Sequence, residues 1–285
     1  MEQETIQTES VYYSSLSNRE FIQISEFIHN QCGIKIPPVK KIMLEGRLRK
    51  RLKSLGMNSF KEYYEYLFSA EGLRNEIVSL IDVVTTNKTD FFRESDHFEF
   101  LRNHILPEYS TSRPILFWSA PCSSGEEAYT LAMVAHDYFQ QRPSNSIRDF
   151  LVWGTDISTQ MLDIAEKGIY DEQKIKQIPS RYLHRYFMRS KNPLIKKFKV
   201  VPELRKKCVF FRLNFMDSDY FLKDKADVVF CRNVIIYFDK NTQELILNRI
   251  VDNMKQGGYL FLGHSETLNG LNVPVNYIAP TIYQK

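Results

Sequence analysis

The sequence lacks the features that mark several common classes of protein. Its four cysteines, Cys32, Cys122, Cys208 and Cys231, show none of the CxxC or CxxH spacings of a zinc site, and they suggest no disulfide framework. No apolar run approaches the roughly 20 residues of a membrane helix, and the chain starts with an acidic, polar segment that is unlike a signal peptide. We therefore expect a cytoplasmic protein that is not embedded in a membrane and uses no metal.

A glycine-rich phosphate-binding turn is also missing. Residues 116–129 read LFWSAPCSSGEEAY, which predicts a buried strand, a tight turn and the start of a helix. A dinucleotide fold would place G-x-G-x-x-G here, but the turn holds only Gly125. Glu126 and Glu127 suit a helix N-terminus and would repel a phosphate. Unless the two acids only complement the helix dipole, the turn favours a cationic or neutral nucleoside, and S-adenosylmethionine fits that description.

The first third of the chain predicts an all-helical domain. Residues 1–15 resemble a flexible tail, and residues 16–84 show helical periodicity. Ser17 and Glu20 form a capping-box pattern at the start of the first helix. Further helices are expected over residues 39–55, 59–68 and 73–83.

From residue 115 the pattern changes to alternating strands and helices, which predicts an α/β fold. Several strands read as nearly continuous apolar runs, which favours a parallel sheet covered on both faces. Strands are expected over residues 115–120, 150–155, 208–214, 226–231 and 259–263, with helices over 126–140, 159–167 and 242–255. Residues 277–283 suggest one final antiparallel strand. Residues about 170–207 are basic and irregular, and they predict an inserted subdomain. Residues 85–114 link the two parts.

Polar residues follow the second and third predicted strands of this sheet. Asp156 ends the second strand, where an acid accepts hydrogen bonds from ribose hydroxyls in doubly wound folds. Asp is equally suited to cap the next helix. Asn214 and Phe215 follow the third strand, where an amide beside an aromatic ring can bind an adenine. A turn asparagine beside a core phenylalanine is the structural alternative.

Two further segments combine polar and aromatic residues. Residues 231–238 read CRNVIIYF after the fourth strand, and ligands of open α/β sheets bind beyond the carboxyl ends of the strands. Residues 85–93 read TTNKTDFFR in the link between the two domains. The first segment favours a functional loop. The second is compatible with a functional segment or a domain linker.

The second predicted helix carries a concentration of basic residues. Residues 35–53 contain eight lysines or arginines and one acid, Glu45. Arg47, Lys50 and Lys53 are expected on the side opposite the leucines. This face is a candidate docking surface for an acidic protein partner, although a solvated surface would look the same. The helix lacks the interleaved aromatics of a nucleic-acid site.

Taken together, these motifs closely resemble those of the CheR-type chemotaxis receptor methyltransferases. The resemblance rests on TTNKTDFFRE, FWSAPCSSGEEAYTLAM, GTDIS, RYFMR, NF, FCRNVIIYFD and GGYLFLGHSE, and it covers nearly the whole chain. It implies a Rossmann-like S-adenosylmethionine-dependent methyltransferase domain over residues 115–285, with an inserted small β-subdomain and a helical N-terminal domain. It also implies methyl transfer to glutamates in the helical cytoplasmic domain of a methyl-accepting chemoreceptor, with S-adenosylhomocysteine as the product.

The resemblance implies roles for individual residues. Cofactor contacts are expected from Asn87, Thr89, Arg93, Glu126, Glu127, Asp156, Asn214, Phe215, Arg232 and Asn233. Arg93 and Tyr237 match the pair nearest the transferred methyl and are the expected catalytic residues. Whether Glu126 or Glu127 contacts the cofactor stays open.

One stretch departs from the family pattern. Family members that tether to a receptor's C-terminal pentapeptide have a glycine-rich turn in the β-subdomain, whereas residues 190–196 read SKNPLIK. We therefore predict an enzyme that needs no pentapeptide tether, and we expect a monomer.

Rival functions fit the sequence less well. The missing glycines disfavour a nicotinamide dehydrogenase. A DNA amino-methyltransferase would carry Asn/Asp-Pro-Pro-aromatic where this chain has Arg232-Asn233-Val234-Ile235. A non-catalytic module that senses S-adenosylmethionine or a nucleotide remains the alternative.

Overall fold

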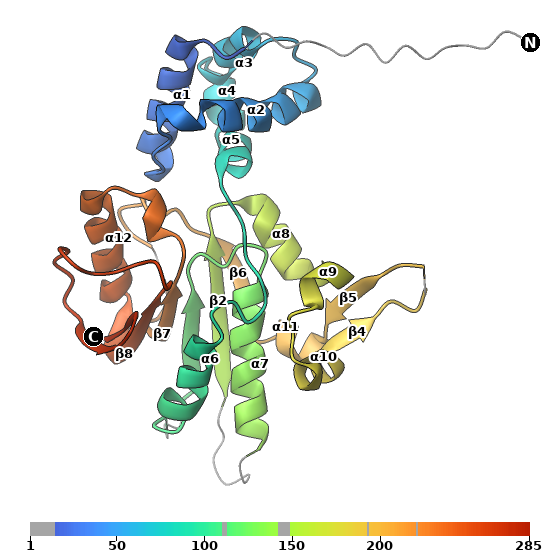
Figure 1. The fold of residues 1–285 in the computed structure, drawn as a ribbon, viewed down its shortest axis with the longest axis vertical. Helices are drawn as coiled ribbons and strands as arrows, with labels where there is room; N and C mark the ends of the chain where they lie inside the picture. Colours follow the sequence, from blue (N-terminus) through green and yellow to red (C-terminus); the bar gives the residue numbers. More distant parts are fainter. Residues whose placement is uncertain (1–14, 110–112, 142–148, 193, 221) are drawn as a thin grey trace, which may run out of the picture. The chain divides into compact units, whose positions relative to one another are not determined.

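The computed structural model describes residues 15–109, 113–141, 149–192, 194–220 and 222–285. The chain divides into two compact units, Met1–Thr85 and Thr86–Lys285 (Figure 1). The expected tail falls almost entirely outside the described residues. Within the part of the chain that the structure describes, no helix is both long and apolar enough to cross a membrane.

The N-terminal unit is helical, as the periodicity predicts. The capping box is confirmed, because the Ser17 hydroxyl accepts from the Glu20 N–H and a Glu20 carboxylate oxygen accepts from the Ser17 N–H. Gly33 and Gly56 end their helices in the left-handed conformation. The helical elements are α1 (Asn18–Cys32), the 3-10 turn η1 (Pro38–Lys40), α2 (Lys41–Leu55), α3 (Phe60–Leu67), α4 (Gly72–Asn75) and α5 (Ile77–Val84).

The expected helix over residues 73–83 is divided in two at Glu76. This carboxylate is fully buried between α4 and α5. Its oxygens accept two hydrogen bonds from Arg51, at 2.8 and 2.6 Å, and one from the Tyr63 hydroxyl at 3.0 Å. A buried charge needs such partners, and they hold the chain at the junction. Sequence periodicity contains no signal for this contact.

The prediction that Arg47 projects into solvent together with Lys50 and Lys53 is wrong. Its guanidinium donates to the backbone oxygens of Val84 and Thr85 at the end of α5. Carbonyl groups at a helix C-terminus lack intrahelical donors and attract a cation. Arg47 is therefore a structural residue, whereas Lys50 and Lys53 are exposed.

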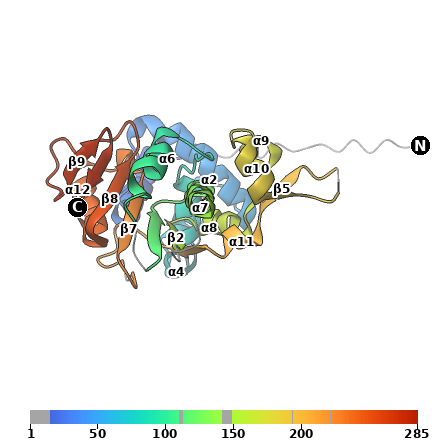
Figure 2. The same cartoon turned by 90° about the horizontal axis from the view of Figure 1, so that it is seen from below.

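The second unit is built on a seven-stranded sheet with the order β6-β2-β1-β7-β8-β10-β9 (Figures 1 and 2). Its strands are β1 (Ile115–Ser119), β2 (Phe150–Asp156), β6 (Cys208–Arg212), β7 (Ala226–Cys231), β8 (Met254–Leu262), β9 (Asn276–Ala279) and β10 (Ile282–Gln284). The first five are parallel, and β10 is antiparallel to β8 and β9. The single strand expected over residues 277–283 is therefore wrong, because the chain turns at Pro280-Thr281 and forms a hairpin.

The strand order creates a switch point between β1 and β7. From β1 the chain builds outward through β2 to β6, and from β7 it builds in the other direction to β8. Ligands of open α/β sheets bind beyond the carboxyl ends of the strands at such a point. The helices of this domain are α6 (Asp96–Phe100) continued by the π-helix η2 (Leu101–Ile105), α7 (Glu126–Gln140), α8 (Thr159–Lys167), the 3-10 turn η3 (Ile235–Tyr237) and α12 (Lys240–Asp252).

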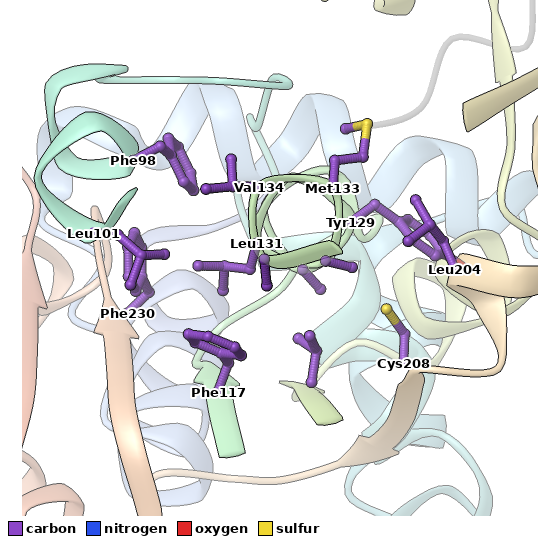
Figure 3. Packing of buried hydrophobic residues seen from close by; sticks show 14 of the residues in the cluster. Phe98, Leu101, Phe117, Tyr129, Leu131, Met133, Val134, Leu204, Cys208 and Phe230 are labelled. Carbon is purple, nitrogen blue, oxygen red and sulfur yellow. The ribbon is translucent and has the colours of Figure 1, made fainter. Parts of the chain in front are cut away.

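Helix α7 is the central helix of the hydrophobic core and is seen nearly end-on in Figure 2. Most of its residues are buried. Its side chains pack toward Phe117 of β1, Cys208 of β6 and Phe98 of α6 (Figure 3). Because α7 follows the turn at Gly125 directly, this packing also fixes the position of that turn above the sheet.

The inserted subdomain lies between β2 and β6 in the sequence and appears in yellow in Figure 1. It contains a small antiparallel sheet of order β3-β5-β4, as the irregular basic stretch predicts, and three short helices. Its elements are β3 (Ile169–Asp171), α9 (Glu172–Ile175), α10 (Ser180–Tyr186), β4 (Phe187–Arg189), β5 (Lys197–Val200) and α11 (Pro202–Arg205).

Candidate cofactor and active site

A polar cavity lies at the carboxyl ends of β1, β2 and β7, at the switch point. Its walls are Thr86, Asn87, Lys88, Thr89, Asp90, Arg93, Phe98, Pro121, Ser123, Glu127, Asp156, Arg232 and Asn233. Three segments far apart in the sequence thus meet, namely residues 86–98, the turn after β1 and the end of β7, and Asp156 at the end of β2 completes the wall. Among the described residues predicted for the site, Glu126, Asn214, Phe215 and Tyr237 do not line this cavity.

The turn after β1 separates its two acids. Gly125 has φ +93°, and a Cβ here would lie 2.8 Å from that of Ala165, so only glycine fits. Glu127 faces the cavity, where it accepts hydrogen bonds from the Ser119 hydroxyl at 2.6 Å and from Arg232 at 3.0 Å. Glu126 turns away to Ser124 and Lys174. Burial raises the pKa of both carboxyl groups, and their basic partners oppose that rise.

Arg232 connects the three segments. Its side chain is only 1% exposed. The guanidinium donates to Glu127, to Glu94 at 2.8 Å and to the backbone oxygen of Arg93 at 2.7 Å. Burial alone would raise the pKa of Glu94, but hydrogen bonds from Arg232 and Asn233 lower it to about 2. Arg232 is therefore an ion-paired support of the cavity wall as well as part of its lining.

Arg93 lies in a strained segment that the ion pairs hold in place. Phe92 and Glu94, its two neighbours, both have positive φ, at 55° and 54°. Such angles are uncommon for residues other than glycine and persist only where surrounding contacts enforce them. The Arg93 guanidinium donates to the backbone oxygen of Lys88 at 3.0 Å and remains about one-third exposed at the cavity.

Asp156 is not the cap of α8, since Ser158 takes that position and its hydroxyl accepts from the Met161 N–H. One Asp156 oxygen accepts from the Ser123 N–H at 2.8 Å and the other from the Ser158 N–H at 2.9 Å. These contacts hold the carboxylate in the wall of the cavity.

Three of the predicted residues lie beside the cavity rather than in its wall. Asn214 and Phe215 follow β6, and the N–H of the preceding Leu213 donates to the backbone oxygen of Asp156 at 3.0 Å. Tyr237 ends the short turn η3 after Asn233. Their roles in adenine binding and catalysis stay predictions.

Glu266 is a supporting residue that sequence reasoning missed. Its oxygens accept from the backbone N–H groups of Asn233, Val234 and Ile235, and also from Gly263, at 2.7 to 2.9 Å. The loop that leads to η3 is thus held by one buried carboxylate. A glutamate just after a strand gives no sequence signal of which loop it will bind.

One cluster near Arg232 has the residue types of a metal site. Ligand atoms of Glu94, His97 and His264 lie within 4.8 Å of one another. Both Glu94 oxygens, however, already accept hydrogen bonds from Arg232 and Asn233. The adjacent guanidinium also opposes a second cation. We therefore interpret the cluster as part of the contacts that hold residues 86–98 in place.

The fold and the cavity together define a class of protein. The sheet order, the single glycine in the first turn and the acids Glu127 and Asp156 are those of a Rossmann-like methyltransferase that uses S-adenosylmethionine. The residues present fit this cofactor, since the Glu127 carboxylate faces the cavity and complements a cationic group, and the Asp156 carboxylate, an acceptor of the kind that suits ribose hydroxyls, lies in the same wall.

Comparisons with known proteins identify the family. Residues 19–85 match the all-alpha domain of the CheR methyltransferases, and residues 87–283 match their SAM-binding domain. A chemotaxis protein methyltransferase of Borreliella burgdorferi is 38% identical, over 95% of each chain. One of Escherichia coli is 37% identical, over 94% of this chain and 91% of its own. The chain belongs to the CheR methyltransferase family, and its cofactor is S-adenosylmethionine.

The buried His97 predicts a pH dependence of folding. Burial and the nearby Arg232 lower its pKa from 6.5 to about 4. As the pH falls, His97 is protonated in the unfolded chain before it is protonated in the folded protein. The free energy of unfolding is therefore greatest above pH 6.5 and decreases as the pH falls toward 4. We expect a loss of up to about 3 kcal/mol from this group. Urea denaturation should show a flatter pH slope for His97→Gln, and an unchanged slope would contradict the prediction. The exposed His184→Gln serves as control.

The opposite orientations of the two acids predict different effects of their amides. Glu127→Gln removes the charge that faces the cavity and should weaken S-adenosylhomocysteine binding by about tenfold or more in calorimetric titration. Glu126→Gln should leave it within about threefold, because that side chain does not line the cavity and the amide oxygen of the variant can still accept from Lys174. Equal losses of affinity in the two variants would mean that Glu127 is not the acid that faces the cofactor.

Proposed function

We propose that this protein transfers a methyl group from S-adenosylmethionine to glutamate side chains in the helical cytoplasmic domains of chemoreceptors. The products are glutamate methyl esters and S-adenosylhomocysteine, and the reaction takes place in the cytoplasm. The observation that carries the proposal is Arg93, whose guanidinium lines the cofactor cavity and is about one-third exposed, so that an acidic acceptor can reach it. The relatives of Borreliella burgdorferi and Escherichia coli are both named chemotaxis protein methyltransferases, which supports an acceptor that takes part in chemotaxis.

The chemistry requires little of the protein beyond positioning. A glutamate has a reference pKa near 4.3, so the acceptor is already ionised at pH 7 and no general base is needed. The cofactor supplies a methyl group activated by its sulfonium. The chain's residues must bring the acceptor into line and remove water from its carboxylate.

The cavity suggests how these tasks are divided. Arg93 binds one oxygen of the acceptor carboxylate and leaves the other free to attack. Glu127 faces the cationic end of the cofactor, and Asp156 accepts from the ribose. Asn87 and Thr89 line the same cavity and contact the cofactor, and Arg232 and Asn233 lie by its methionine end.

The roles outside the cavity wall follow from the family resemblance. Tyr237 orients the acceptor through its hydroxyl. Asn214 and Phe215 bind the adenine from the loop beside Asp156.

The exposed face of α2, continued by the preceding turn η1, is the proposed docking site for the receptor. We call it the α2 face and define it by Val39, Ile42, Met43, Lys50 and Lys53. Val39 and Ile42 are 86% and 82% exposed, and the two lysines are exposed on the same helical stripe. Apolar side chains beside cations suit a partner that presents acids around an apolar ridge, as an amphipathic acidic helix does.

The turn between β4 and β5 supports a tether-independent enzyme. The Asn192 side chain accepts from the Leu194 N–H, and the Asn192 backbone oxygen accepts from the Ile195 N–H. Among the described residues of this turn, 190–192 and 194–196, none has positive φ. These residues therefore do not adopt the positive-φ backbone that a glycine-rich turn allows. Tight binding of a free pentapeptide in a titration would contradict this proposal.

Methyl transfer can be tested directly. The protein is incubated with methyl-labelled cofactor and purified receptor cytoplasmic domains. We expect label in the receptor that is released by mild base, as a glutamate ester requires. Bound cofactor without transfer to any receptor domain would support a sensory module instead.

Arg93→Ala should separate binding from turnover. Because the guanidinium is proposed to hold the acceptor carboxylate, turnover should fall about 100-fold or more, while S-adenosylhomocysteine affinity changes by less than about threefold. Arg93→Lys should recover only part of the rate, since an ammonium lacks the planar fork. Methyl-transfer rates and calorimetry on the same samples give both numbers, and near-normal turnover of Arg93→Ala would remove this residue from the mechanism.

Charge reversal on the α2 face should impair docking without affecting the chemistry. Lys50→Glu/Lys53→Glu should raise KM for the receptor about tenfold and make it less dependent on salt. The affinity for S-adenosylhomocysteine should not change. Lys61→Glu on α3 is the matched control, since Lys61 is exposed and lies outside the α2 face. An equal effect of both variants on KM would indicate general charge repulsion rather than a docking site.

A further inference from the structure

The inserted subdomain packs against the segment that carries the cofactor and catalytic residues. Phe91 meets the rings of Tyr170 and Phe187, with centroids 4.9 and 5.5 Å apart. Phe92 meets the ring of Tyr182 at 5.0 Å. Thr89 and Arg93, on either side of the two phenylalanines, line the cavity instead. Residues 86–98 therefore pack against the inserted subdomain on one side and line the cofactor cavity on the other.

One polar contact accompanies these apolar ones. Lys174, on α9 of the inserted subdomain, donates to the backbone oxygen of Thr89 at 2.6 Å. The same ammonium lies 3.1 Å from Glu126 and 3.8 Å from Asp90. A single cation therefore joins the inserted subdomain, residues 86–98 and the first turn of α7.

The partners of this ammonium explain why it is held firmly. Glu126 is fully buried, and its other oxygen accepts from the Ser124 hydroxyl at 2.7 Å. A buried carboxylate strongly favours a fixed cationic partner. The ion pair with Glu126 therefore places the Lys174 ammonium, and the ammonium in turn fixes the Thr89 carbonyl with a charge-assisted hydrogen bond.

We propose that Lys174 is a positioning residue for cofactor binding. It does not contact the cofactor but acts through Thr89, whose backbone it holds at the cavity wall. The inserted subdomain thereby contributes to cofactor affinity as well as to the fold. This inference rests on the proposed cofactor contacts of Asn87 and Thr89.

Titration of the full-length protein with S-adenosylhomocysteine tests the proposal without requiring an acceptor. Lys174→Met should weaken binding about tenfold, whereas Lys174→Arg should stay within about threefold of the wild type. Lys176→Met, an exposed lysine two residues further along the chain, should bind normally. In methyl-transfer assays Lys174→Met should raise KM for S-adenosylmethionine and keep kcat at saturation. Wild-type affinity of Lys174→Met, or a loss of kcat with KM unchanged, would overturn the proposal.

A double variant distinguishes positioning from simple charge balance. In Lys174→Met the buried Glu126 loses its partner, so part of the effect could come from that charge. Lys174→Met/Glu126→Gln removes the charge and should regain thermal stability while binding stays about tenfold weaker. Full recovery of binding in the double variant would show that Thr89 is not held by Lys174. Because these measurements require no receptor, they remain informative even if the proposed acceptor is wrong.

Discussion

The site depends on the buried guanidinium of Arg232. It contacts the carboxylates of Glu94 and Glu127 and the backbone oxygen of Arg93, and it thereby joins residues 86–98 to the turn after β1. Removing a charge of this kind from water is costly, and only several good partners offset the cost. The same contacts maintain the strained backbone on both sides of Arg93. The cavity wall and residues 93 and 94 are therefore one electrostatic unit.

Around this unit, rigid elements determine where each functional group lies. Helix α7 packs into the core and places Glu127 at the end of β1. Glu266 holds the loop after β7 through four backbone N–H groups. On the side away from Arg232, residues 86–98 are supported by Lys174 and by the rings of Tyr170, Tyr182 and Phe187. Such outer contacts matter because methyl transfer to an ionised carboxylate depends mainly on alignment.

Much of this arrangement could be predicted where local patterns are strong. The apolar runs predicted the parallel strands, and Ser17 with Glu20 predicted the start of α1. The predictions failed where a distant partner decides the outcome. Glu76 divides an expected helix because Arg51 and Tyr63 bind its carboxylate. Arg47 is half-buried because it donates to carbonyl groups at the end of α5.

The sequence by itself determined the two-part organisation and the order of the five parallel strands along the chain. It also favoured a ligand without a pyrophosphate, since the first turn holds one glycine and two acids. Only the tertiary structure decided which acid faces that ligand. Glu126 and Glu127 are neighbours with the same chemistry, and their spacing on a helix points them in different directions without saying what lies there. Lys174 from the inserted subdomain binds one and Arg232 from the end of β7 binds the other. Contacts between residues so far apart in the chain form only when the whole domain is folded.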